Sequence, residues 1–189
     1  MRTALLALLL FAAMPARAGE PILASGARDG ATPAWTITGT APDGWTADCC
    51  TYARAIGVDA VVYRGEWTGE PQRVMVLNVW PAKLPSLQAE LAADRTRYHQ
   101  RDPAGRDATV AIAQPHMRCL ANVYEGSDHL DDMVVFCDPG KASGVRLSWS
   151  MTLAADEPQR RPLLDALLRV VAGTAYRRGA TALPASAQP

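Results

Sequence analysis

The sequence lacks an excess of charge of either sign. Its 189 residues include 19 Lys and Arg and 19 Asp and Glu. Loss of Arg2 and Arg17 with the leader described below would leave a net charge near minus two. Nucleic acids and anionic membranes select strongly basic surfaces. We therefore expect neither of them as a partner.

Recognisable catalytic motifs are also missing. The chain has no Gly-x-Ser-x-Gly nucleophile elbow. The segment 137–143 resembles a phosphate-binding loop, but Val135 stands where that loop needs a glycine and Ala142 where it needs Ser or Thr. We expect a hairpin loop at this place, no cofactor, and a protein that binds rather than catalyses.

Histidine is scarce, which limits metal binding. No two of His99, His116 and His129 have the i, i+3 or i, i+4 spacing of a helical metal site. His129 does have Asp131 and Asp132 close by, a set that could ligate zinc. A loop histidine among acids is more often a solvated side chain, so we expect no metal.

No cysteine lies near the start of the chain, which excludes a lipid-anchored lipoprotein. Arg2, an apolar run over 4–14 and Ala16-Arg17-Ala18 have the pattern of a secretory signal peptide over 1–18. The run of 11 residues is shorter than the roughly 20 that cross a bilayer. We expect a periplasmic or secreted protein with no membrane anchor after cleavage.

Cysteines are present in an even number, at Cys49, Cys50, Cys119 and Cys137. In an exported chain this favours disulfides over metal or catalytic thiols. One interpretation pairs Cys119 with Cys137 and leaves Cys49 and Cys50 to pair with each other. The alternative is two crossed bonds, each joining one adjacent cysteine to one strand cysteine. A third reading, a redox protein that uses Cys49 and Cys50, would need a reduction potential above that of a structural disulfide.

Strand register favours the first pairing. The segments 118–125 and 131–138 are two β-rich runs around a loop at 126–130. If the chain folds back at Asp128, Cys119 lies opposite Cys137 and Arg118 lies opposite Asp138. The same register gives the hairpin one continuous apolar face.

Hydrophobic periodicity divides the chain into strands and two main helices. The expected strands are 35–40, 59–64, 73–80, 108–113, 118–125, 131–138 and 145–153. The expected helices carry Leu84, Leu87, Leu91 and Tyr98, ending at Asp102-Pro103, and Leu164, Leu167, Leu168, Val171 and Ala175. Short connections make the sheet mainly antiparallel. The pattern predicts an α+β fold, an α/β/α sandwich, over 35–178, with a flexible segment at 19–34 and a disordered tail at 179–189.

This layout resembles a known superfamily. The order of elements, the early Pro42-Asp43-Gly44-Trp45, the helix from Leu84 and the closing leucine-rich helix are similar to the PsbP-like α/β/α sandwich. The resemblance covers roughly 35–178. That superfamily includes photosystem extrinsic proteins, exported bacterial proteins and chaperones of type VI effectors. It has no shared catalytic signature, so the resemblance implies binding and assigns no site residue.

The loop 65–71 is the candidate interaction site. Trp67 lies between Glu66 and Glu70 at the tip of a predicted hairpin, and exposed tryptophans are enriched at interface hot spots. We expect these residues to contact an envelope or secreted protein, as in an immunity or accessory protein. Alternatively the loop folds back and buries Trp67, as we expect for the other tryptophans, Trp35, Trp45, Trp80 and Trp149.

Two further alternatives stay open. A small apolar ligand could bind between sheet and helix instead of a protein partner. An envelope glycan or peptide hydrolase could use the acidic residues of the 65–71 loop, because paired carboxylates around an aromatic ring occur in sugar-cleaving sites. Such an enzyme would need Glu66 or Glu70 to be desolvated.

Export makes a direct prediction about the mature chain. When the full-length gene is expressed in a bacterium with a signal peptidase, N-terminal sequencing of the periplasmic protein should begin at Gly19. A product that keeps residues 1–18 would contradict the signal-peptide assignment.

Overall fold

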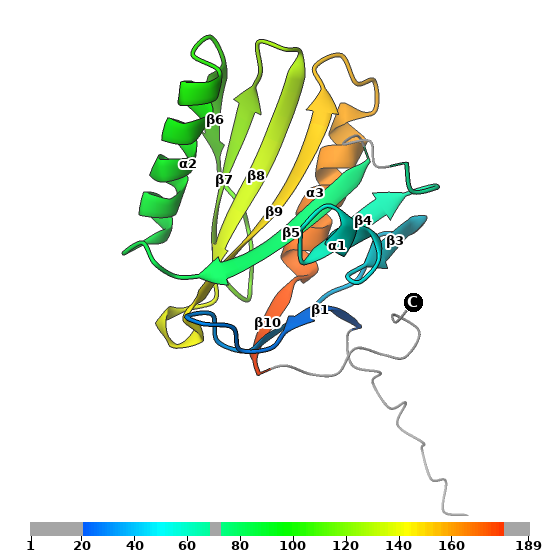
Figure 1. Cartoon of the computed structure of the whole chain (residues 1–189). Helices are drawn as coiled ribbons and strands as arrows, with labels where there is room; N and C mark the ends of the chain where they lie inside the picture. Colours follow the sequence, from blue (N-terminus) through cyan, green and yellow to red (C-terminus); the bar gives the residue numbers. More distant parts are fainter. Residues whose placement is uncertain (1–20, 69–72, 180–189) are drawn as a thin grey trace, which may run out of the picture.

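The computed structural model describes residues 21–68 and 73–179, which form two sheets and three α-helices (Figure 1). The strands are β1 (Ile22–Gly26), β2 (Trp35–Thr38), β3 (Trp45–Asp48), β4 (Ala60–Arg64), β5 (Val74–Pro81), β6 (Arg106–Val110), β7 (Arg118–Glu125), β8 (Leu130–Asp138), β9 (Val145–Ala154) and β10 (Ala175–Arg178). The helices are α1 (Tyr52–Ala55), α2 (Leu87–Arg101) and α3 (Arg160–Gly173), with a 3-10 turn at Lys141–Ser143.

Both sheets are antiparallel, which confirms the α+β class. The large sheet has the order β3-β4-β5-β9-β8-β7-β6, and the small sheet has the order β1-β2-β10. In Figure 1, α2 lies in front of the large sheet at its β7 and β8 side, and α3 runs behind it. The small sheet lies at one end, below α3 in this view. Of the described helices, none combines the length and the hydropathy that a bilayer crossing requires.

Side chains of the central strands alternate between the two faces. Along β9, Leu147, Trp149 and Met151 point into the main core that α3 covers, and all three are fully or almost fully buried. Ser148 and Ser150 lie between them and point to the opposite face. The main core therefore forms on the α3 side of the sheet, where apolar side chains are continuous.

The β7–β8 hairpin has the register that the sequence predicts. Cys119 pairs with Cys137, and Arg118 pairs with Asp138. The sulfur atoms of Cys119 and Cys137 are bonded to each other. The hairpin therefore brings the two cysteines together by strand pairing alone.

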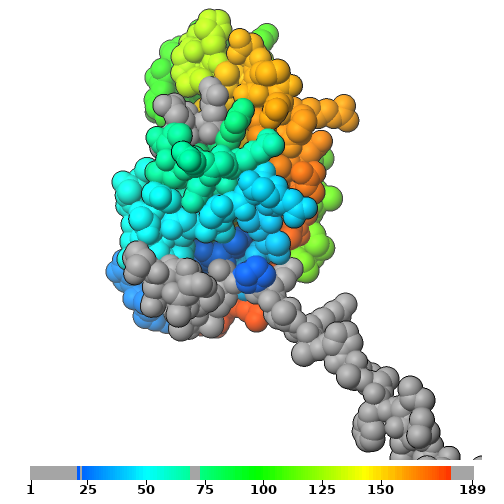
Figure 2. All heavy atoms as spheres, turned by 90° about the vertical axis from the view of Figure 1, so that its right-hand side faces the viewer, coloured from blue at the N-terminus to red at the C-terminus, as the bar shows by residue number. Residues whose placement is uncertain are grey.

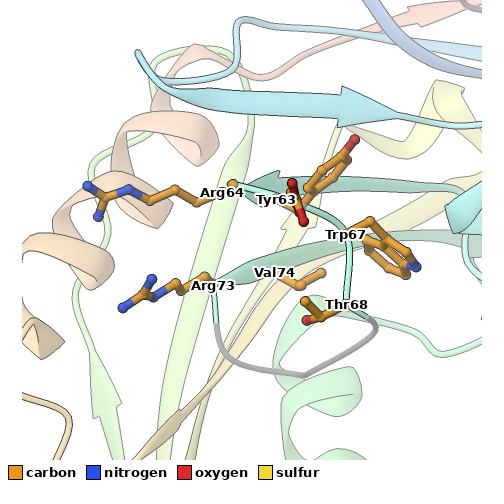
Figure 3. Close-up of a pocket in the computed structure, with 8 residues that line it drawn as sticks. Tyr63, Arg64, Trp67, Thr68, Arg73 and Val74 are labelled. Atoms are coloured by element: carbon orange, nitrogen blue, oxygen red, sulfur yellow. The ribbon is translucent and has the colours of Figure 1, made fainter.

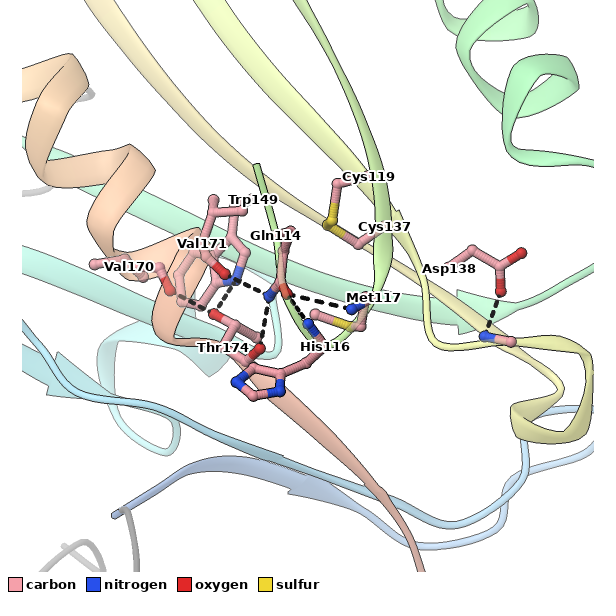
Figure 4. The surroundings of a disulfide bond; sticks show 11 residues. Gln114, His116, Met117, Cys119, Cys137, Asp138, Trp149, Val170, Val171 and Thr174 are labelled. Carbon is pink, nitrogen blue, oxygen red and sulfur yellow. Dashed lines mark hydrogen bonds between the residues drawn. A yellow bond between two sulfur atoms is a disulfide. The ribbon is translucent and has the colours of Figure 1, made fainter. Parts of the chain in front are cut away.

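Polar contacts join the end of α3 to the sheet (Figure 4). The indole N–H of Trp149 donates to Thr174 Oγ1 at 3.0 Å. The Gln114 amide donates to the carbonyl oxygens of Val171 and Thr174, both at 2.8 Å, and accepts from the backbone N–H of Met117. Carbonyls at the end of a helix have no partner within the helix, so Gln114 supplies the donor that this end needs.

The small sheet is the main difference from the sequence analysis. Strand β1 lies within 19–34, which we expected to be flexible, and β10 occupies Ala175–Arg178, where we expected the end of the closing helix. The central strand β2 is buried along its whole length, and its backbone groups need partners on both sides. Strands β1 and β10 provide them.

Other boundaries and burials also differ from expectation. Strand β6 begins and ends earlier than the predicted 108–113. Leu84 lies outside α2 and is exposed, because the helix starts after Ser86, whose Oγ accepts from Ala89 N. Trp45 and Trp80 are half-buried, unlike the fully enclosed Trp149.

A buried carboxylate holds α2 against the strands beneath it. Asp107 on β6 accepts from Arg95 Nε at 2.6 Å and contacts His99 Nε2 at 2.7 Å, both on α2. It also accepts from the Asn122 amide on β7 at 3.1 Å. Burial alone would raise the pKa of Asp107, but these hydrogen bonds from His99, Asn122 and Arg95 lower it below its ordinary value.

Replacement of Asp107 by Asn should lower the free energy of unfolding by about 1–3 kcal/mol, because Arg95, His99 and the buried Asn122 lose a charged acceptor. The carboxylate stabilises the fold above its unfolded pKa of about 4, and this contribution is lost as the pH falls through its lower folded pKa. Asn does not titrate, so unfolding of Asp107→Asn should depend less on pH below about 4. Urea unfolding at several pH values measures both effects, and parallel pH profiles for the two proteins would contradict them.

Candidate functional site

The β4–β5 hairpin presents the residues singled out in the sequence. Its last described pair is Arg64 and Arg73, where the Arg64 N–H donates to the Arg73 carbonyl at 3.1 Å. The chain leaves β4 through Gly65 at φ +80°, a conformation that favours glycine. Glu70 lies outside the described residues, and Glu66 is exposed to solvent.

Trp67 folds back onto α1 and β4. Its indole stacks on the Tyr52 ring with centroids 4.7 Å apart and an interplanar angle of 14°. The Tyr63 ring meets Trp67 edge-on at 5.5 Å. Such ring pairs stabilise beyond the apolar area they bury. Trp67 is nevertheless only half-buried, so part of the ring stays accessible beside the hollow described next.

Two arginines share a hollow of about 330 Å³ with this tryptophan (Figure 3). Arg64 at the end of β4 and Arg73 just before β5 lie opposite each other and point to the same side, away from Trp67. Like charges at opposed strand positions destabilise a sheet. The Arg64 guanidinium donates to Gln159 Oε1 at 3.2 Å, and Arg73 makes no ion pair among residues 21–68 and 73–179. The pair is thus open to an anionic group.

Tyr63 stays neutral in this setting. Burial raises the pKa of its phenol, and the neighbouring Tyr52 and Asp48 raise it further. The hydroxyl therefore keeps its proton at physiological pH and can donate a hydrogen bond. Among the described residues that line the hollow, the charged groups are therefore Arg64, Arg73 and Glu66.

The other two cysteines lie in the turn before α1. Cys49 and Cys50 are bonded to each other. The Asp48 carboxylate holds this turn, since its Oδ1 accepts from Tyr52 N at 2.7 Å and Ala53 N at 2.9 Å. Figure 2 shows the β3–α1–β4 region, in cyan, across the middle of this side, with α3 in orange beside it.

The three histidines singled out in the sequence form no common site. His99 contacts Asp107, as described, while His116 and His129 are exposed. Across the described part of the chain, no three His, Cys, Asp or Glu side chains gather closely enough to hold a metal.

In the loop after β8, Asp138 Oδ1 accepts from Gly140 N at 2.7 Å and pairs with Arg146. The protein's own carboxylate therefore satisfies a loop amide that a phosphate-binding loop would leave open.

Sequence reasoning identified Trp67 and missed its neighbours. Tyr52 and Tyr63 come from α1 and β4, and nothing in their local pattern marks them. Eight residues, 65–72, separate Arg64 from Arg73 in the sequence, and the hairpin brings the two together. Extending the predicted pairing to the hairpin tip would have revealed them. Comparison with known proteins adds no relative, because the chain matches no protein-family model and no curated protein.

Both disulfides can be tested in a single digest. Trypsin should release residues 29–54, with Cys49 and Cys50, and residues 119–141, with Cys119 and Cys137. Without reduction, each peptide should appear separately by mass spectrometry and lighter by two hydrogens than its reduced form, because each contains its own bond. A covalent complex of the two peptides would show the crossed arrangement instead.

Proposed function

We propose that this chain is an exported, disulfide-bonded binding protein of the bacterial periplasm or of the secreted fraction. It captures a protein partner through the tip patch, which we define as Tyr52, Tyr63, Arg64, Trp67 and Arg73. The observation that carries the proposal is the half-buried Trp67 ring in a hollow that it shares with two opposed arginines. The leader-like start of the sequence and the two disulfides support an oxidising location.

The composition of the tip patch is that of an interface hot spot. Trp, Tyr and Arg are the residues most enriched where truncation weakens binding strongly. Stacking on Tyr52 holds Trp67 in one orientation, so little side-chain entropy remains to be lost on binding. An acidic side chain from a partner would relieve the repulsion between Arg64 and Arg73. The patch therefore fits a partner that combines an apolar contact with a carboxylate.

The class of partner follows from location and resemblance. An exported domain with a PsbP-like layout and no recognisable catalytic motif suits an immunity or accessory protein for a secreted toxin or an envelope complex. Fold alone does not assign such a role. The tip patch makes the role testable, because it names the surface through which the partner would bind.

The hydrolase alternative receives no comparable support. Its acid Glu66 is exposed to solvent, and its second acid Glu70 lies outside the described residues. Among the residues that line the described hollow, Glu66 is the only carboxylate. A two-carboxylate mechanism needs a pair with different environments.

Capture of a partner should depend on Trp67. Mature protein immobilised as bait should retain an envelope protein, and Trp67→Ala should lower its affinity at least tenfold, about 1.4 kcal/mol. Charge reversal in Arg73→Glu should weaken the same complex, because the partner contributes an acid. Affinities are measured with the purified partner by biolayer interferometry.

Matched variants separate binding from folding. Leu130→Ala removes an exposed apolar side chain outside the patch and should bind like the parent. Trp67→Phe keeps a ring on Tyr52 and should retain part of the affinity. Thermal melts report whether each variant folds. Full affinity in a folded Trp67→Ala variant would rule out the tip patch as the binding surface.

A further inference from the structure

A groove runs between α2 and the uncovered part of the large sheet. Its volume is about 620 Å³, within the range of small-ligand sites. Trp80, Val134 and Phe136 are among its apolar lining residues, and Trp80 meets Phe136 edge-on with ring centroids 6.1 Å apart. Figure 1 shows β9 and β5 uncovered beside α2 on this face. The aromatic residues of the tip patch lie farther along the same face, beside α1 and β4, and no residue of the patch lines this groove.

The groove exists because small side chains occupy its middle. Ser148 on β9 lies between Asn78 on β5 and Phe136 on β8 in the strand register. A serine there leaves a depression between larger neighbours. Helix α2 packs on β7 and β8 and does not extend over β9. Its buried Leu87 and Leu91 contact the Phe136 cluster and fix the helix as one wall.

One carboxylate oxygen in this wall lacks a hydrogen-bond partner. Glu90 on α2 is only 8% exposed, and its Oε1 is buried without a hydrogen bond from any described residue. The next acid on the same helix face is satisfied, because Asp94 accepts from the Tyr124 hydroxyl at 2.6 Å and pairs with Arg97 at 3.3 Å. A buried carboxylate oxygen without a donor is costly. We therefore expect Glu90 Oε1 to accept a hydrogen bond from a group outside the described residues.

Two cationic side chains, Arg97 and Lys83, line the same groove. Glu90 and Arg97 are seven residues apart on α2, which places them about 10 Å apart along the helix axis. Arg97 is exposed, so its guanidinium can contact a ligand while it remains near Asp94. Lys83 also lines the groove and makes no ion pair among the described residues. An acid at one end and a guanidinium at the other suit a molecule with both charges.

We propose that this groove binds a short apolar peptide with free termini. The peptide ammonium group donates to Glu90, one apolar side chain packs on Trp80 and Phe136, and the terminal carboxylate meets Arg97. Extended chain advances at most about 3.5 Å per residue, so a tripeptide spans the distance between the two charged groups and a single amino acid does not. The inference is independent of the tip patch, which is not needed for peptide binding.

Calorimetric titration of the mature chain with Leu-Leu-Ala tests the proposal. We expect saturable binding, and N-acetylation of the peptide should weaken it at least tenfold, because Glu90 loses its charged donor. Amidation of the carboxyl end should weaken binding only a few-fold, since Arg97 is exposed. Free leucine should bind far more weakly than the tripeptide. Equal affinity of the free and acetylated peptides, of leucine and the tripeptide, or no binding at millimolar concentration would overturn the proposal.

Variants locate the site independently of the peptide series. Glu90→Gln keeps the side-chain shape and should lose at least tenfold in affinity for Leu-Leu-Ala while responding little to acetylation. Glu125→Gln changes an exposed acid outside the groove and should bind like the parent. Ala93→Leu adds bulk to the groove wall and should block binding. Thermal melts confirm folding, and if Ala93→Leu fails to fold, Glu90→Gln decides alone: unchanged affinity in it would overturn the site.

Discussion

The strict alternation of side chains along β8 and β9 is the constraint on which the rest of this structure depends. Met133, Val135 and Cys137 point to the same face as Leu147 and Trp149, and together they form the core beneath α3. A slip of one residue in either strand would turn this whole set toward the other face. The register is therefore held by the burial of many apolar side chains at once, with the Cys119–Cys137 bond as a covalent addition.

The opposite face has a different character because small polar side chains occupy its middle strand. Helix α2 covers one end of it and α1 the other, while Ser148 and Ser150 occupy the strand between them. The groove beside α2 and the aromatic residues of the tip patch lie on this face, while Arg64 and Arg73 point to the α3 side. The α3 face closes the core and supplies stability, so the rigid central strands leave the second face available for recognition.

Contacts between segments close together in the sequence could be predicted, whereas contacts between distant segments could not. The β7–β8 hairpin and its disulfide followed from local alternation around one turn. Strands β1 and β10 did not, because their short sequences gain stability only by pairing with β2, which lies elsewhere in the chain. Trp67 stood out by residue type, whereas its partner Tyr52 comes from α1 and had no local signal.

The sequence by itself determined the α+β class, the hairpin pairing of Cys119 with Cys137 and the loop that carries Trp67, because these depend on periodicity, turn residues and residue type. Only the tertiary structure decided which way Trp67 turns, that Arg73 lies opposite Arg64, and that Glu90 is buried beside an open groove. The physical reason is that burial and charge environment arise from segments distant in the chain. The part of the large sheet that α2 leaves uncovered therefore cannot be identified from any local sequence pattern.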